Sequence, residues 1–155
     1  MSRPTSVQER YAPQNHCFGC GPANPKGLRI RSFEEADSLR AEWLPEPQHE
    51  AFDGAVNGGI LSTLLDCHSN WAAALHLMRQ GGRSALPATV TAELRVRFLR
   101  VTPSDRPLVL SARVTESSED RATVEASVES DGKPTATCRA VFVAVKEGHP
   151  AFHRW

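Results

Sequence analysis

Two adjacent glycines and one carboxylate are the residues of this chain with the clearest capacity for chemistry. Gly58 and Gly59 open a long apolar stretch that ends near Met78, and Asp66 is its only acidic residue. Glycine weakens a helix, but at the first helical positions it leaves backbone N–H groups open to a ligand carbonyl. With the positive end of the helix dipole, such donors can form an oxyanion hole. The same glycines would also let a helix pass close to another element, and the pattern alone does not separate these interpretations.

Asp66 follows Gly58 by eight residues, which corresponds to about 12 Å along a helix. One site within one chain cannot include both residues. A second helix running antiparallel would bring its own Asp66 to this Gly58, so the spacing predicts a two-fold dimer with two shared sites, provided that both residues act together. In apolar surroundings the pKa of a carboxyl group rises toward the range of a general base. The alternative is a carboxylate that faces solvent or bonds a neighbouring side chain.

Other polar residues surround this pair in the sequence. Asn57 is a good N-cap for the helix, and Asn70 lies one turn after Asp66, where it could orient a water or a substrate group. His49 precedes the helix and either lines the mouth of the site or is an ordinary loop residue. His68 lies on another face, and we expect it to be a packing or surface residue.

A CxxC motif stands near the start of the chain, in the stretch "HCFGCG". Its cysteines, Cys17 and Cys20, have the spacing of two zinc ligands, but the second pair that such sites need is missing. We therefore predict no metal and interpret the motif as a structural knuckle holding the N-terminal segment, in preference to a zinc site or a redox pair. Cys67 and Cys138 lie in apolar periodic segments and are predicted to be small core residues.

Hydrophobic periodicity predicts the elements that must position these residues. Apolar residues recur at three- and four-residue steps from Gly58 to about Arg79, which indicates one long helix ended by the glycines at 81 and 82. Alternating patterns predict six strands, at 28–33, 38–43, 90–98, 108–114, 124–128 and 135–146. The last is almost continuously apolar and should be central or packed on both faces. Because the helix is apolar around most of its girth, we expect an α+β domain in which an antiparallel six-stranded sheet, its last four strands a meander, wraps one central helix.

The length of 155 residues fits one domain, with an N-terminal arm at 1–16, the domain at 17–147 and a C-terminal tail at 148–155. Eighteen basic and eighteen acidic residues cancel, which argues against nucleic acid or an anionic membrane as a partner. The first fifteen residues lack a secretory core, and no segment approaches the roughly 20 apolar residues of a membrane span. We expect a cytoplasmic protein with thiols and no disulfides.

Read together, these stretches resemble the hotdog-fold acyl-CoA thioesterases, in particular the phenylacetate-degradation (PaaI-like) group. The family's signature is H-G-G, an aliphatic run and an acidic residue, and this chain has "NGGILSTLLD". The stretches "CFGCGPANPKGLRI", "PQHEAFDGAV" and "AELRVRFLRVTP" are also similar, so the resemblance runs from about Cys17 to Lys146. It implies hydrolysis of an acyl-CoA thioester at the interface of a homodimer that pairs into a tetramer. Coenzyme A is then part of the substrate, and no other cofactor is expected.

The resemblance also implies roles by matching position. The Gly58 N–H polarises the thioester carbonyl, Asp66 is the base or the nucleophile, and Asn70 stands where some members carry an assisting hydroxyl. The predicted substrate-binding residues are Asn57, Gly59, Asn70 and His49. Arg97 and Arg100 are candidates for contacts with the coenzyme A phosphates.

Asn57 departs from the family, which usually has histidine there. If that histidine braces the helix start, asparagine can replace it, because its side-chain oxygen also accepts from backbone donors. If the histidine contacts substrate, activity or specificity differs in this chain. The leading hypothesis is hydrolysis by an activated water, with covalent attack by Asp66 left open, and the alternative is a non-catalytic acyl-CoA-binding protein that acts as a ligand sensor. A dehydratase is disfavoured, because that chemistry usually pairs a histidine with an acid. The acyl group is not predictable from the sequence.

Overall fold

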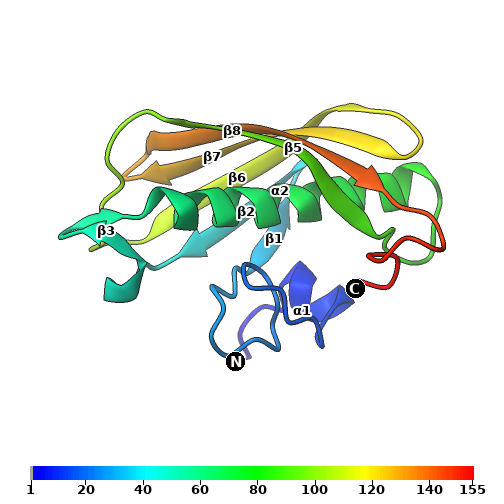
Figure 1. Ribbon diagram of the computed structural model, residues 1–155, viewed down its shortest axis with the longest axis horizontal. Coiled ribbons are helices and arrows are strands. Elements are labelled where there is room, and N and C mark those ends of the chain that lie inside the picture. Colours follow the sequence, from blue (N-terminus) through cyan, green and yellow to red (C-terminus); the bar gives the residue numbers. More distant parts are fainter. Residues whose placement is uncertain (1) are drawn as a thin grey trace.

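The computed structural model describes residues 2–155 (Figure 1), and a six-stranded antiparallel sheet arches over one long helix in it. The short helix α1 and both chain ends lie on the side of the long helix that faces away from the sheet. The elements are α1 Val7–Tyr11, β1 Ser32–Glu35, β2 Ser38–Trp43, the 3₁₀ turn η1 Pro47–His49, β3 Glu50–Phe52, β4 Ala55–Val56, α2 Gly58–Gln80, β5 Thr89–Phe98, β6 Leu108–Ser117, β7 Arg121–Ser130 and β8 Lys133–Ala144. The predicted hotdog arrangement is confirmed.

Helix α2 begins and ends where the sequence predicts. The Asn57 side-chain Oδ1 accepts hydrogen bonds from the N–H groups of Gly59 at 2.7 Å and Ile60 at 3.3 Å, so Asn57 is the N-cap. At the other end the Gly81 N–H donates to the Leu77 carbonyl, and Gly82 has φ 62°, a left-handed conformation that turns the chain out of the helix.

The core fills the space between α2 and the inner face of the sheet. Its largest fully buried apolar side chains are Leu64, Leu65, Trp71 and Leu77 from α2, and Leu108, Leu110, Val124, Val128 and Phe142 from the sheet. Fully buried aliphatic and aromatic side chains each contribute about 1.5–3 kcal/mol relative to exposure, which explains why a helix that is apolar on most sides is stable only inside this sheet.

The strand order is β1-β2-β6-β7-β8-β5, which corrects the predicted meander of the last four strands. β6, β7 and β8 do follow one another, but β5 pairs with β8 and not with β6, so β8 is an interior strand next to the edge and not at the centre of the sheet. The connection 99–107 carries Pro103 and Pro107 and is too long for a tight hairpin, so it crosses the end of the sheet instead. β5 is therefore an edge strand, and its outer side pairs with no strand among residues 2–155.

The first strand is shorter than predicted. It begins at Ser32, because Arg29 has φ 52° and interrupts the extended conformation expected over 28–33. Leu28 and Ile30 are buried all the same, since their N–H groups donate to the Phe18 and Gly19 carbonyls of the cysteine loop. Two apolar residues that looked like one face of a strand instead fix the cysteine loop to the domain.

The N-terminal arm contains a short helix that the sequence analysis did not predict. Ser6 and Glu9 form a reciprocal capping box at its start. Gln8 is buried and bonds Ser32 twice, with its Nε2 donating to Oγ at 2.9 Å and its Oε1 accepting from the backbone N–H at 2.8 Å. The arm thus packs on its own domain.

His68 completes this buried network. Its Nε2 donates to the Leu39 carbonyl at 3.0 Å, so its Nδ1 is the acceptor for the Ser32 hydroxyl at 2.7 Å. Burial lowers the pKa of His68 to about 4, and the residue is a neutral packing group, as predicted. Within residues 2–155, none of the helices has the length and apolar character that crossing a bilayer requires.

Candidate functional site

The start of α2 presents one free backbone donor. Asn57 Oδ1 accepts from Gly59 and Ile60, and the Asn57 carbonyl accepts from Leu61 at 3.1 Å. The Gly58 N–H is the remaining amide of the first turn, and it has no acceptor among the residues that the structure describes. Since the helix dipole adds to its positive potential, this amide can polarise a carbonyl oxygen.

Local packing also explains why glycine occupies both position 58 and position 59. A Cβ on Gly59 would lie 2.9 Å from Asn57 Oδ1, too close for the cap to keep its geometry. A Cβ on Gly58 would lie 3.3 Å from the Phe98 ring, which is a tight contact with a partly exposed side chain. Gly59 therefore serves the cap, and Gly58 keeps the approach to its amide open.

An apolar groove of about 320 Å³ borders this amide. Its walls include Gly58, Leu61, Phe52, Phe98 and Val101. The last three are large apolar side chains with 63%, 56% and 63% of their surface exposed, an unusual gathering on a protein surface. Such a groove suits the hydrocarbon part of a ligand whose carbonyl reaches Gly58.

Asp66 lies half-buried in the middle of α2 and faces β5. Its Oδ1 accepts a hydrogen bond from the Thr91 hydroxyl at 2.7 Å. Burial raises the pKa of the Asp66 carboxyl, and this effect outweighs the opposing influence of the Thr91 hydrogen bond and the Arg154 charge. This direction agrees with the raised pKa expected in apolar surroundings, and Asp66 also bonds a neighbouring side chain, as the alternative interpretation expects.

The C-terminal tail supplies that arginine, a contribution that sequence reasoning missed. Arg154 Nη1 donates to the Thr89 carbonyl at 2.7 Å, and its guanidinium stacks on the Trp155 ring. Trp155 in turn packs on Trp71 of α2, with ring centroids 4.5 Å apart. Nothing in the local pattern of residues 148–155 signals these contacts, because they join the C-terminal tail to α2 and β5, which lie far away in the sequence.

Asn70 and His49 have their polar atoms engaged within the chain. Asn70 Oδ1 accepts from the Thr89 hydroxyl, and its Nδ2 donates weakly to the Thr89 carbonyl at 3.4 Å. His49 packs on Trp43, its Nδ1 accepts from the Glu46 N–H, and its carbonyl accepts from the Asn57 N–H. In one copy of the chain these residues brace β5 and the helix start, and their predicted contacts with substrate remain predictions.

Three candidate site residues of α2 follow the edge strand β5 in order. Asn70 bonds Thr89, Asp66 bonds Thr91, and Gly58 lies against Phe98 at the far end of β5. Gly58 and Asp66 therefore stay about two helical turns apart, as the rise of an α-helix requires. Both of them face β5, whose outer side has no partner strand within residues 2–155. Thr91 is the residue that sequence reasoning missed here, because the alternation of β5 does not reveal which position meets the helix.

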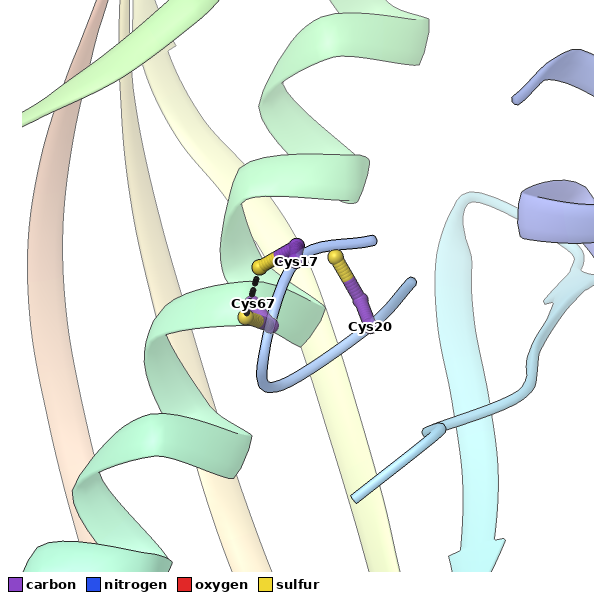
Figure 2. A group of neighbouring side chains, drawn as sticks. All are labelled: Cys17, Cys20 and Cys67. Atoms are coloured by element: carbon purple, nitrogen blue, oxygen red, sulfur yellow. Dashed lines mark hydrogen bonds between the residues drawn. The ribbon is translucent and has the colours of Figure 1, made fainter. Parts of the chain in front are cut away.

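Three of the cysteines form a cluster that the sequence did not predict. Cys67 is buried as predicted, but it is more than a core residue, because it lies against the CxxC loop and brings a third sulfur to Cys17 and Cys20 (Figure 2). Hydrogen bonding from the Cys20 and Cys67 thiols lowers the pKa of the Cys17 thiol, whereas Cys17 raises the pKa of Cys20 to about 12. Cys138 lies apart, near the Ser69 hydroxyl.

Comparison with known proteins matches residues 53–139, more than half of the chain, to the model of the thioesterase superfamily. A thioesterase superfamily protein from Shewanella loihica has a similar structure, with a TM-score of 0.70, 26% identity, and coverage of 90% of this chain and 100% of its own. A putative thioesterase from Ralstonia eutropha, described as related to phenylacetic acid degradation, gives 0.60 with 27% identity over 74% of this chain and 82% of its own. The PaaI protein of E. coli gives 0.65 with 18% identity over 77% and 81%, which supports the fold. No curated protein matches the sequence.

Proposed function

Because the chain belongs to the thioesterase superfamily, we propose that it hydrolyses acyl-CoA thioesters at a site shared between two copies of itself. The observation that carries this proposal is the free Gly58 amide beside an apolar groove, on the same helix as a half-buried carboxylate. One feature binds a carbonyl oxygen and the other activates water. Within one chain, the Gly58 amide and the Asp66 carboxylate cannot act on the same thioester, because about 12 Å of helix separates them.

Pairing of the edge strand β5 with its copy in a second chain would bring the Gly58 amide and the partner's Asp66 together. β5 has ten residues, and its outer side has no partner strand within residues 2–155. If two β5 strands pair antiparallel about a two-fold axis at Arg95, the register irregularity between Thr91 and Glu93 lets Phe98 lie opposite the partner's Thr91. The partner's Asp66, which bonds that Thr91, then approaches Gly58, and the symmetry creates two such sites.

The proposed reaction follows from these groups. The Gly58 N–H donates to the thioester oxygen, and the partner's Asp66 accepts a proton from a water molecule as the water oxygen bonds to the carbonyl carbon. The negative charge develops on the oxygen that faces the amide, where a preorganised donor stabilises it best. The carbon–sulfur bond then breaks, and the proton held by Asp66 passes to the leaving thiolate of coenzyme A. Thr91 bonds one carboxylate oxygen and leaves the other available to the water.

The surface near Gly58 offers separate places for the acyl group and for the coenzyme A phosphates of the proposed substrate. The acyl chain or ring fits the apolar groove at Phe52, Phe98 and Val101. Arg97 and Arg100 are exposed close to that end of β5, where their charges can bind the phosphates of coenzyme A.

The first test is release of free thiol from a panel of aryl- and medium-chain acyl-CoAs by the purified protein. Asp66→Asn keeps the size of the side chain and its hydrogen bond from Thr91 but removes the base, and we expect it to lower kcat by roughly 10²-fold or more. Binding of acyl-CoA without turnover in the unmutated protein would favour the ligand sensor, and unchanged turnover in Asp66→Asn would exclude Asp66 from the mechanism.

The second test asks whether the site is shared. Asp66→Asn and Gly58→Pro are each expected to be inactive, the second because proline has no N–H. After the two variants are unfolded and refolded together, half of the dimers are mixed, and each mixed dimer has one intact site. About one quarter of the wild-type activity should therefore return. A site built within one chain predicts no recovery, and different affinity tags on the two variants verify that mixed dimers form.

A further inference from the structure

Three cysteine thiols from two distant segments meet on the side of α2 that the N-terminal loop covers. The Sγ atoms of Cys17, Cys20 and Cys67 all lie within 4.8 Å of one another (Figure 2). Cys20 and Cys67 are buried, Cys17 is half-buried, and all three are free thiols. Neither the N-cap at Asn57 nor the Gly58 and Asp66 pair needs this cluster, so the proposed hydrolysis leaves it unexplained.

The cysteine loop is built to approach the helix closely. A Cβ on Gly19 would lie 2.3 Å from Cys67 Sγ, and a Cβ on Gly21 would lie 2.4 Å from the Cys17 backbone nitrogen. Such distances leave room for glycine alone. The Gly21 N–H donates to the Cys17 carbonyl at 2.9 Å and closes the loop. Glycine at positions 19 and 21 therefore allows the loop to bring the Cys17 and Cys20 sulfur atoms close to Cys67.

The sulfur geometry matches a tetrahedral ion better than a disulfide. Two thiolates bound at about 2.3 Å to one tetrahedral zinc ion lie about 3.8 Å apart, and Cys17 Sγ lies 3.8 Å from Cys67 Sγ. A disulfide would require about 2.05 Å. The positions of these two sulfurs therefore already correspond to one edge of a zinc coordination tetrahedron.

A buried donor points to the same cluster. The Trp71 indole N–H is fully buried and has no hydrogen-bond acceptor of regular geometry within residues 2–155. Trp71 follows Cys67 by four residues on α2, so it lies one turn further along the same face of the helix. An anionic sulfur ligand in this cluster would give the unpartnered indole N–H an acceptor, like the outer hydrogen bonds that metal ligands commonly receive.

We propose that Cys17, Cys20 and Cys67 bind one Zn²⁺ ion as three thiolate ligands. The thiol protons pass to solvent on binding, and no oxidation or reduction is involved. Cys17 also lines a cavity of about 490 Å³ between the N-terminal loop and the C-terminal tail, and a water molecule from this cavity would complete the coordination. The ion ties the N-terminal loop to the turn of α2 that carries Asp66.

The test uses the full chain purified under reducing conditions. We expect one zinc per chain by elemental analysis, and X-ray absorption at the zinc edge should give three sulfur neighbours at about 2.3 Å. Replacement by Co²⁺ should add thiolate charge-transfer bands to the absorption spectrum. Cys17→Ser and Cys67→Ser should weaken binding by more than the roughly 10- to 100-fold that loss of an outer hydrogen bond costs.

Cys138→Ser is the matched control, because Cys138 is also a buried thiol but lies outside the cluster. It should keep the zinc and the cobalt bands. The proposal is overturned by unmutated protein that binds no zinc, by fewer than three sulfur neighbours, by Cys67→Ser that binds as tightly as the wild type, or by a Cys17–Cys67 disulfide formed in place of the ion. The X-ray absorption measurement uses the unmutated protein, so it tests the proposed zinc site even if Cys67→Ser fails to fold.

Discussion

Gly58→Pro compared with Gly58→Ala isolates a single hydrogen-bond donor. Proline removes the backbone N–H, and it is well tolerated at the first helical position, where that group has no helical partner. Asn57 has φ −61° and ψ 136°, the extended conformation that a residue before proline adopts. The helix should therefore begin as before in both variants. Alanine adds the same Cβ against the Phe98 ring, 3.3 Å away, but keeps the N–H.

The expected loss follows from the count of donors. Asn57 already occupies the amides of Gly59 and Ile60, so within residues 2–155 the first turn offers only the Gly58 N–H to a substrate carbonyl. Removal of one oxyanion-hole donor typically lowers kcat by about 10²- to 10³-fold, or about 3–4 kcal/mol. We expect a loss of this size in Gly58→Pro relative to Gly58→Ala.

The assay is steady-state thiol release from an acyl-CoA substrate that the wild type hydrolyses, with the melting temperature of each variant measured in parallel. Equal kcat values for the proline and alanine variants, with both proteins folded, would refute the role of the Gly58 amide. If those equal values also lie below the wild-type kcat, the loss comes from crowding against Phe98.

The remaining predictions concern stability. Gly19→Ala should lower the midpoint of denaturant unfolding, because its Cβ would lie 2.3 Å from Cys67 Sγ, and overpacking of this kind costs about 1–3 kcal/mol; an unchanged midpoint would show that the loop can move away. Gln8→Leu should destabilise by about 1–3 kcal/mol, since it leaves the buried Ser32 N–H without its acceptor, and amide hydrogen exchange should show the arm opening first. His68 has a pKa near 4 in the folded chain against its ordinary 6.5, so its contribution is complete above pH 6.5 and falls by about 3 kcal/mol as the pH drops to 4. Chemical unfolding at several pH values measures this slope, which should disappear in His68→Gln.

The sequence predicted those features whose signals are local. Asn57 and the glycines after it marked the start of α2, and the alternating strands together with the resemblance led to the hotdog fold and the thioesterase superfamily, both of which are confirmed. The position of β5 beside β8 escaped prediction, because strand alternation does not encode which strands become neighbours. Arg29 ended the expected first strand through a left-handed conformation that its residue type does not announce.

Contacts between segments that are distant in the sequence could not be predicted from it either. Cys67 follows the CxxC motif by a long interval and from within an apolar helix, so no ligand spacing connected the three sulfurs. The same holds for Thr91 and Arg154 around Asp66. The sequence therefore identified the polar positions of the helix, while tertiary packing determined what each of them meets.

In a copy of the chain that has not yet paired with another, the exposed edge of β5 favours aggregation. A long unpaired strand can add to any other strand, which makes it a starting point for aggregation unless charged side chains limit the pairing. Glu93, Arg95 and Arg97 are exposed along β5 and provide such charges. Their replacement by β-branched apolar residues in an attempt to tighten association would remove that protection, so the protein would precipitate before it gained a better-defined assembly.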